Sequence, residues 1–315
     1  HSTESALLRV INDLYSAVDN GQIALVVLLD LSAAFDTIDH NIMLSRLKDL
    51  GLSSTALTWF ESHLVGRTYR VIVRDSSSSD YHLPWGVPQG SILGPVLYSL
   101  YTTPLSTLIK SYNIPHHLYA DDTMLYLTSS PESLHFNQAK SDMEDCCCAI
   151  KTWMTNNFLK LNEEKTEVIL VGKGTNLQKV PDKNITIAGT KVLFSDCVKY
   201  LGFYIDNQLT SNQHIRHVTS IAHFQLRRIA TIRRCLTRKA ASTLAVTLVM
   251  SLLDYCNSLL AGATQGQIQR LQRLQNICAR IVVRPPKMAQ ISPILRVLHW
   301  LPVHRRIQYK VLCKV

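Results

Sequence analysis

Three aspartates stand at positions where carboxylates could support metal-dependent chemistry. Asp30 directly follows the apolar run Ile23–Leu29, which is typical of a strand buried on both faces. Asp121 and Asp122 lie near the centre of residues 116–127, a segment whose pattern predicts a β-hairpin. An ionised carboxylate among apolar strands is costly unless a cation or another partner compensates its charge. If the two strands are neighbours in one sheet, Asp30 and Asp121 come close together.

The chemistry that such a pair supports is phosphoryl transfer with divalent cations. Two Mg²⁺ ions, with Mn²⁺ as the alternative, can be held about 3.5–4 Å apart by shared carboxylates. One ion lowers the pKa of an attacking hydroxyl, and the other neutralises the leaving phosphate. The structural alternative is that these acids only form caps and turns. We prefer that alternative for Asp36 and Asp39, which lie between the strand and an apolar-periodic helix.

The elements that must position these acids follow from the periodicity of the apolar residues. A helix capped by Ser2 precedes the first strand, and further helices are predicted near 40–50, at 54–64, after Pro95 and near 131–156. Further strands are predicted at 70–74, 168–171 and 198–205. After residue 206 the pattern is helical, at 214–235, 238–260 and 265–283. The predicted fold class is therefore α+β, followed by an all-α segment.

The charge of the chain is divided unevenly between these two parts. The net charge is +10, but residues 1–206 carry 16 Lys and Arg against 22 Asp and Glu. Residues 207–315 carry 17 Lys and Arg against one acid, Asp254. A basic surface can simply confer solubility, but an imbalance of this size favours contact with a polyanion such as nucleic acid.

Composition excludes several other classes of protein. With 46% hydrophobic and 18% charged residues, the chain is that of a folded globular protein. No apolar run is long enough to span a bilayer, and no signal peptide is visible, so no membrane partner is expected. The eight cysteines lack paired spacing and are expected to be reduced thiols without disulfide partners in an intracellular protein. Cys146–Cys148 cannot all face one metal ion, because neighbours on a helix point about 100° apart.

Five segments, in order, carry a resemblance to a known family. Leu28–Asp36, Gly86–Pro95 and Tyr119–Asp122 resemble motifs A, B and C of the reverse transcriptases of non-LTR (LINE-type) retrotransposons. Asn162–Val168 resembles motif D, and Tyr200–Phe203 resembles motif E. The resemblance continues to the end of the chain. It implies a right-hand polymerase, with a palm and partial fingers over residues 1–206 and a basic helical thumb and post-thumb segment over 207–315.

The resemblance also implies roles for individual residues. Asp30, Asp121 and Asp122 would be the catalytic, metal-binding carboxylates. Lys165 would protonate the pyrophosphate leaving group, although an ordinary solvated lysine is the alternative. The residues implied to bind substrate are Leu31 (through its carbonyl), Phe35 (the ring that excludes a 2′-hydroxyl), Gln89, Gly90 and Tyr119. The residues implied to bind nucleic acid are Tyr200, Leu201 and Gly202 as the primer grip and Arg227, Arg228, Arg233 and Arg234 in the thumb.

The implied activity is RNA-directed DNA synthesis, in which dNTPs are added to a primer 3′-hydroxyl. The partners would be an RNA template, a DNA primer or target, and dNTPs, in the cytoplasm and the nucleus. The chain is expected to be a segment of a longer protein that also has an endonuclease and the rest of the fingers. A truncated, catalytically inactive nucleic-acid-binding relic is the alternative. A template-independent or RNA-synthesising polymerase is disfavoured by Phe35.

Overall fold

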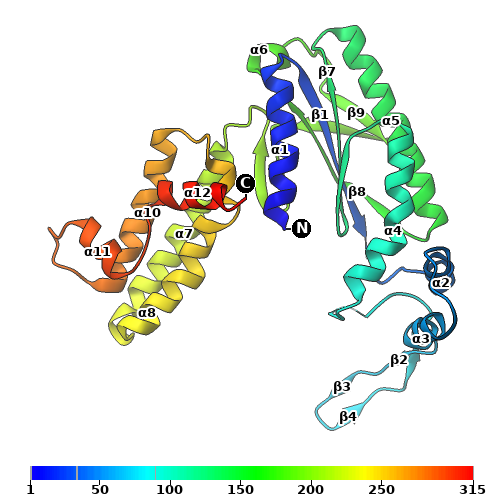
Figure 1. Cartoon of the computed structure of the whole chain (residues 1–315), viewed down its shortest axis with the longest axis horizontal. Helices are drawn as coiled ribbons and strands as arrows, with labels where there is room; N and C mark the ends of the chain where they lie inside the picture. Colours follow the sequence, from blue (N-terminus) through cyan, green and yellow to red (C-terminus); the bar gives the residue numbers. More distant parts are fainter. Residues whose placement is uncertain (1, 33–34, 89, 315) are drawn as a thin grey trace. The chain divides into compact units, whose positions relative to one another are not determined.

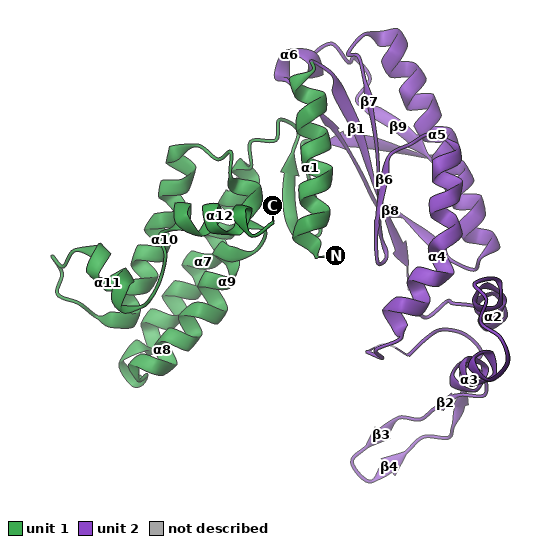
Figure 2. Ribbon diagram, in the orientation of Figure 1, with its two compact units in different colours: residues 1–20, 196–315 green, residues 21–195 purple. Residues whose placement is uncertain are grey.

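The computed structural model describes residues 2–32, 35–88 and 90–314, which form two compact units (Figure 2). One unit contains residues 21–195, and the other combines residues 1–20 with residues 196–315. The unit of residues 21–195 is a sheet covered by helices and is called the sheet unit, and the other is mainly helical and is called the helical unit (Figure 1). The predicted α+β class is therefore confirmed.

A six-stranded sheet is the centre of the sheet unit. Its strand order is β6-β7-β1-β8-β10-β9. The strands are β1 (Ile23–Ser32), β6 (His116–Tyr119), β7 (Asp122–Ser129), β8 (Lys160–Val171), β9 (Asn184–Ile187) and β10 (Thr190–Ser195). β1 is antiparallel to both of its neighbours, and residues 23–29 are buried, as the continuous apolar run predicted. The central strand therefore carries Asp30 just beyond its most buried part.

Two long helices share a hydrophobic core with one face of β1. These are α4 (Gly94–Ser111) and α5 (Ser133–Asn156). Successive side chains of a strand point to opposite faces, and the odd-numbered residues of β1 from Ile23 to Leu31 lie in the same core as Tyr98, Tyr101 and Ile150. Cys146 and Cys147 are buried in this core, whereas Cys148 is exposed. Two of the three adjacent thiols are therefore packing residues.

The segment between β1 and α4 forms two helices and a hairpin. The helices are α2 (His40–Asp49) and α3 (Ser54–Leu64), and Asp39 caps α2 by accepting a hydrogen bond from the Ile42 amide at 2.9 Å. The predicted cap is therefore confirmed. The predicted strand at 70–74 is wrong in extent. It is replaced by two short ladders, in which β2 (Thr68–Tyr69) pairs with β5 (Tyr81–His82) and β3 (Ile72–Val73) pairs with β4 (Ser76–Ser77).

The helical unit combines the N-terminal helix with the basic part of the chain. Its elements are α1 (Thr3–Asp19), β11 (Cys197–Tyr200), β12 (Phe203–Asp206), α7 (Asn212–Ile232), α8 (Arg238–Ala245), α9 (Ser251–Asp254), α10 (Gln265–Val283), α11 (Ile291–Val297) and α12 (Val303–Leu312). Two predictions need correction here. The single strand predicted at 198–205 is a hairpin that turns at Leu201 and Gly202, and the helix predicted at 238–260 is interrupted by a π-helical turn, Val246–Met250.

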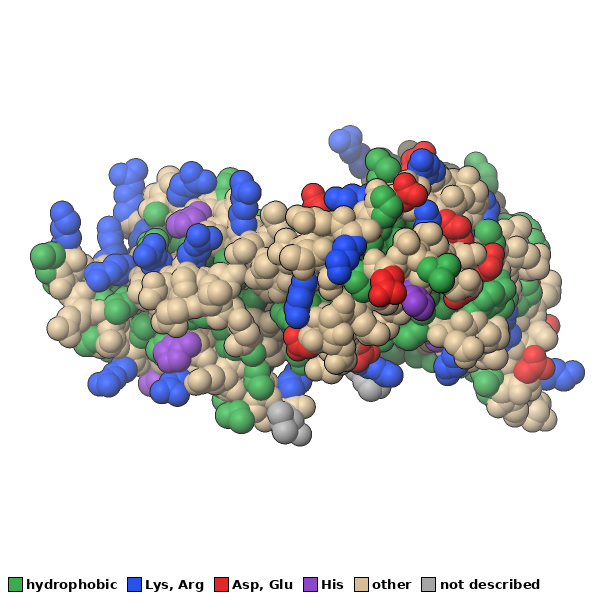
Figure 3. Space-filling view, turned by 90° about the horizontal axis from the view of Figure 1, so that it is seen from above, with side chains coloured by type: hydrophobic (Ala, Val, Ile, Leu, Met, Phe, Trp, Pro, Cys, Tyr) green, Lys and Arg blue, Asp and Glu red, His purple; other side chains and the backbone are tan. Residues whose placement is uncertain are grey.

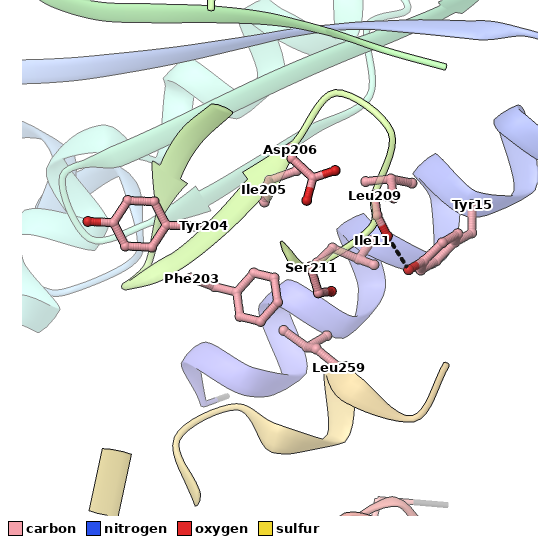
Figure 4. Close-up of a pocket in the computed structure, with 9 residues that line it drawn as sticks. All are labelled: Ile11, Tyr15, Phe203, Tyr204, Ile205, Asp206, Leu209, Ser211 and Leu259. Carbon is pink, nitrogen blue, oxygen red and sulfur yellow. Dashed lines mark hydrogen bonds between the residues drawn. The ribbon is translucent and has the colours of Figure 1, made fainter. Parts of the chain in front are cut away.

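The helix α1 is held within the helical unit by its own side chains. The Tyr15 hydroxyl donates to the carbonyl oxygen of Leu209 at 3.0 Å (Figure 4). The pocket beside this bond, lined by Ile11 and Phe203 among others, has a volume of about 10 Å³. That is room for about one water molecule and not for a substrate.

The contacts between residues separate the two units after residue 20 and again after residue 195. The functional boundary expected at residue 206 stays a prediction.

A short helix, α6 (Gly174–Leu177), follows β8 in the sheet unit. Within the described residues, no helix combines the length and apolar character needed to cross a bilayer.

Candidate active site

Asp30 and Asp122 lie on adjacent strands at the same end of the sheet. Leu29 of β1 is paired with Thr123 of β7 in antiparallel register. Continuing that register by one residue places Asp30 opposite Asp122. The Asp30 side chain is 31% exposed, in a strand whose preceding seven residues are buried. The buried strand therefore delivers a carboxylate to a partly open position.

Asp121 reaches the same place through a tight turn. Tyr119 of β6 is paired with Asp122 of β7, so the turn between the strands contains only Ala120 and Asp121. Ala120 has a φ of +52°, which a residue with a Cβ seldom adopts. Backbone strain of this kind is found preferentially at functional sites. The turn places two consecutive carboxylates beside the end of β1.

The three carboxylates interact electrostatically. Burial raises the pKa of Asp122, and the negative charges of Asp121 and, to a smaller extent, Asp30 raise it further. Such repulsion is what a bound cation would relieve. Among the described residues, however, no three His, Cys, Asp or Glu side chains are grouped closely enough to hold a metal ion by themselves.

β8 adds two further side chains, Asn162 and Lys165, to Asp30. The Asn162 amide donates to Asp30 Oδ2 at 3.3 Å, and Lys165 Nζ lies 3.5 Å from the same oxygen. The predicted site residue Lys165 is thus placed beside Asp30, although its proton-transfer role stays a prediction. Asn162 was not singled out from the sequence. Its position inside the segment resembling motif D was the available signal.

Phe35 packs against Tyr98 of α4, a second site residue that was not singled out from the sequence. The two ring centroids are 5.1 Å apart with an interplanar angle of 39°. Tyr98 is only 1% exposed. Burial raises the pKa of Tyr98, and the charges of Asp121 and Asp122 raise it further, so its hydroxyl stays protonated. Tyr98 therefore links the aromatic ring of motif A to the carboxylates of motif C.

The loops that carry motifs A and B are joined to each other through their backbones. The amides of Gly86 and Val87 donate to the carbonyl oxygens of Ile38 and Phe35 at 2.8 and 2.9 Å. A Cβ added to Gly86, where φ is +84°, would lie 3.0 Å from the carbonyl oxygen of Asp36. The close backbone approach at Gly86 is thus made to the protein itself.

The remaining residues predicted to contact substrate lie in the segments that resemble motifs A, B and C. Gly90 is exposed, has a φ of +78° and has open space where a Cβ would be, while Gln89 lies outside the described residues. Leu31 is buried and paired with Leu161 of β8. Tyr119 is half-buried, and its ring is stacked with that of His117 at a centroid distance of 6.4 Å. Their roles stay predictions.

The predicted primer grip, Tyr200 to Gly202, belongs to the other unit. Leu201 and Gly202 both have positive φ, at 45° and 78°, as a two-residue hairpin turn of the primed type requires. Tyr255 donates from its hydroxyl to the carbonyl oxygen of Leu201, and its ring would be 3.2 Å from a Cβ added to Gly202. Tyr200 is only 2% exposed, so its side chain is a packing group and only the turn is accessible.

Of the four predicted thumb arginines, three are exposed and one is not. Arg227, Arg228 and Arg234 are exposed. Arg233 is 8% exposed, and its guanidinium donates to the carbonyl oxygens of Ile281, Val282 and Leu236, each at 2.8 Å. The prediction for Arg233 is therefore corrected, because its donors are used by two carbonyls at the end of α10 and by the Leu236 carbonyl. Lys and Arg side chains are dense over the helical unit in the view of Figure 3, whereas Asp and Glu gather over the sheet unit.

The sheet and its covering helices form the mixed α/β architecture that the resemblance implied for a polymerase palm. Residues 2–205 match the family described as "Reverse transcriptase (RNA-dependent DNA polymerase)". Because the match includes more than half of the chain, the chain belongs to the reverse transcriptase family.

The similar curated proteins come from retrotransposons. The RNA-directed DNA polymerase from mobile element jockey of Drosophila melanogaster is 31% identical over 69% of this chain and 23% of its own length. The probable RNA-directed DNA polymerase from transposon BS of the same fly is 27% identical over 98% of this chain and 34% of its own length. The resemblance to non-LTR elements is thereby confirmed. The chain spans about a quarter to a third of the length of these relatives.

Solved structures of telomerase are also similar, at low identity. The apo telomerase from Candida tropicalis matches 98% of this chain and 50% of its own, with 12% identity and a TM-score of 0.46. Telomerase from Candida albicans, solved with a fragment of telomeric RNA, matches 96% of this chain and 56% of its own, with 14% identity and a TM-score of 0.42. Because both TM-scores are low, the family assignment rests on the sequence match.

Proposed function

We propose that the chain is the polymerase core of a non-LTR retrotransposon protein and adds dNTPs to a primer 3′-hydroxyl opposite an RNA template. The observation that carries the proposal is the arrangement of Asp30, Asp121 and Asp122 at one end of the sheet. Two of them are adjacent across β1 and β7, and the pKa of Asp122 responds to both of the others. Membership of the reverse transcriptase family supports the same activity.

The carboxylates fit a pair of Mg²⁺ ions that bind together with substrate. Mg²⁺ usually takes one or two carboxylates and completes its shell with water and substrate phosphates. This suits a site in which like charges repel and the described side chains do not form a closed cage. Asp30 and Asp121 would hold the ions, with Asp122 and the Leu31 carbonyl in support. When bound, the ions would activate the primer hydroxyl and neutralise charge on the leaving group.

The other residues would position the substrates around this centre. Phe35, held from behind by Tyr98 at 5.1 Å between ring centroids, would lie against the sugar and exclude a 2′-hydroxyl. Lys165, 3.5 Å from Asp30, is close enough to the carboxylates to donate a proton to the departing pyrophosphate. Gly90, exposed and without a side chain, would allow the backbone to approach the nucleotide.

The basic unit would hold the nucleic acid. Arg227, Arg228 and Arg234 are exposed, in a part of the chain with 17 Lys and Arg against one acid. Cationic side chains of this kind contact phosphates without regard to sequence. The turn at Leu201 and Gly202, in which Gly202 is exposed, would contact the primer strand. An RNA template, a DNA primer and dNTPs are the proposed partners.

Primer extension on an RNA template with dNTPs and Mg²⁺ tests the proposal. We expect the chain to extend the primer and Asp121→Ala to abolish extension. Loss of a residue that hydrogen-bonds to a metal ligand typically lowers metal affinity or activity by about 10–100-fold. Loss of the ligand itself is expected to cost more. Asp75→Ala is the matched control, because Asp75 is an exposed aspartate in the hairpin turn between β3 and β4.

The alternative function, a nucleic-acid-binding relic, predicts a different pattern. In that case neither the unaltered chain nor Asp121→Ala would extend a primer, and both would bind nucleic acid with the same affinity. Equal extension by the chain and by Asp121→Ala would contradict the assignment of the site.

A further inference from the structure

The strand β8 departs from regular pairing at the point where it meets Asp30. Leu28 is paired with Glu167, but Asp30 is paired with Asn162, so β8 uses five residue steps where β1 uses two. The three extra residues lie within a β-bulge at 163–166. Bulges occur preferentially beside active sites, where they redirect a side chain. Here the bulge brings both Asn162 and Lys165 to Asp30 Oδ2.

Glu163 joins the bulge to two other elements through hydrogen bonds. One carboxylate oxygen of Glu163 accepts from Lys151 of α5 at 2.7 Å, and the other accepts from the Thr190 hydroxyl of β10 at 2.7 Å. Lys151 also donates to the carbonyl oxygen of Ala188, in the turn before β10, at 2.8 Å. Both oxygens of Glu163 are thus used to join the bulge to α5 and to the β9–β10 hairpin.

A second hydrogen bond, within the bulge itself, stabilises its backbone. The Thr166 hydroxyl donates to the carbonyl oxygen of Asn162 at 3.1 Å, and Thr166 is 6% exposed. Lys165 itself has a highly exposed side chain, at 71%, so packing alone does not restrict it. Its distance from Asp30 therefore depends on the backbone of the bulge, which the hydrogen bonds of Glu163 and Thr166 hold.

We propose that the Lys151–Glu163–Thr190 network is a positioning device that keeps the β8 bulge, and with it Asn162 and Lys165, on Asp30. The proposal rests on the function proposed above. Glu163 acts through Lys165 and Asn162 and does not itself touch substrate. Because misplacement of a reacting group by about 1 Å can cost about 100-fold in rate, a support outside the site can control the reaction.

Backbone hydrogen exchange, read by mass spectrometry on the full chain, tests the support without reference to activity. Glu163→Ala is expected to raise exchange at the sheet amides that flank the bulge, near Asn162 and Glu167, by about tenfold. Glu164→Ala is the matched control, since Glu164 is an exposed glutamate in the same bulge. Unchanged exchange in Glu163→Ala would overturn the proposal.

Single-nucleotide extension at saturating dNTP tests the coupling to the site. We expect Lys165→Ala to slow extension by about 100-fold and Glu163→Ala by about tenfold. The double variant is expected to lose less than the product of the two single losses, because the part of the Glu163 effect that acts through Lys165 is already absent. Glu163→Gln, which keeps one acceptor oxygen, should recover part of the rate, and Glu164→Ala should behave as the unaltered chain.

Two outcomes separate this proposal from the proposed function. Additive losses in the double variant would overturn the positioning of Lys165, even if exchange at the bulge increased. No extension by the unaltered chain would count against the polymerase activity instead, and the exchange comparison would still decide whether Glu163 holds the bulge.

Discussion

Tyr98 connects two parts of the candidate site that are far apart in the sequence. Its ring packs on Phe35, and its pKa responds to Asp121 and Asp122. A buried aromatic ring in such a place has a well-defined orientation, because close packing leaves few alternative rotamers. The position of Phe35 should therefore depend on the ring of Tyr98 more than on its hydroxyl.

We expect Tyr98→Leu to weaken selection against ribonucleotides by about tenfold, because it leaves space behind Phe35. Tyr98→Phe keeps the ring and should keep the selectivity. The measurement is the ratio of incorporation of a dNTP to that of the matching rNTP. Thermal unfolding of both variants separates a change in selectivity from a general loss of stability. An unchanged ratio in Tyr98→Leu would show that Phe35 is held by other contacts.

At the scale of elements, His214 joins the hairpin β11–β12 to α7. Its ring is stacked on Phe203 with a centroid distance of 4.0 Å, and its Nδ1 accepts from the Tyr204 amide at 3.4 Å. An imidazole that accepts through Nδ1 cannot carry a proton there. Burial lowers the pKa of His214 to about 4, with a smaller contribution from His217.

The depressed pKa of His214 predicts that acid weakens the helical unit. An unfolded histidine, with a pKa of about 6.5, binds a proton between pH 6.5 and 4 while the folded one does not, so stability falls as the pH falls through this window. Between pH 7 and pH 5 the expected loss is about 2 kcal/mol. Urea unfolding at the two pH values measures it, with His214→Gln as the neutral comparison. A loss of equal size in His214→Gln would assign the effect to other groups.

At the scale of the whole molecule, the basic charges have two separate uses. The exposed Arg228 lies over the ring of Phe224, with its Cζ 5.6 Å from the centroid, whereas Arg233 is buried and bonded to three carbonyl oxygens. Net charge counts both arginines equally. Only a side chain that reaches solvent, however, can release counterions from a nucleic acid.

These two arginines are therefore expected to respond differently to the same substitution. Arg228→Gln should weaken nucleic-acid binding and reduce the slope of log affinity against log salt by about one unit. Arg233→Gln should leave that slope unchanged and destabilise the chain by about 3 kcal/mol, because buried carbonyls lose their donors. Binding titrations over a range of salt, with urea unfolding, give both quantities. A smaller salt slope in Arg233→Gln would restore its predicted contact with phosphate.

Several features were determined by short stretches of the sequence. The apolar run before Asp30 predicted a buried strand, and the helices at 54–64 and 265–283 were predicted within their observed bounds. The cap at Asp39 could also be predicted, because a cap depends on residues three positions apart. The five motifs identified the family, since their order and spacing are properties of the chain itself.

The tertiary structure decided which side chains meet. Asn162 contacts Asp30 across 132 positions of sequence, and that contact depends on a bulge that no periodic pattern predicts. The burial of Arg233 depends on carbonyl groups at the end of α10, and the turn at Leu201 places a leucine where glycine is usual. Local propensity and periodicity describe a residue and its near neighbours, whereas pairing register and burial are set by elements that come together only when the chain folds.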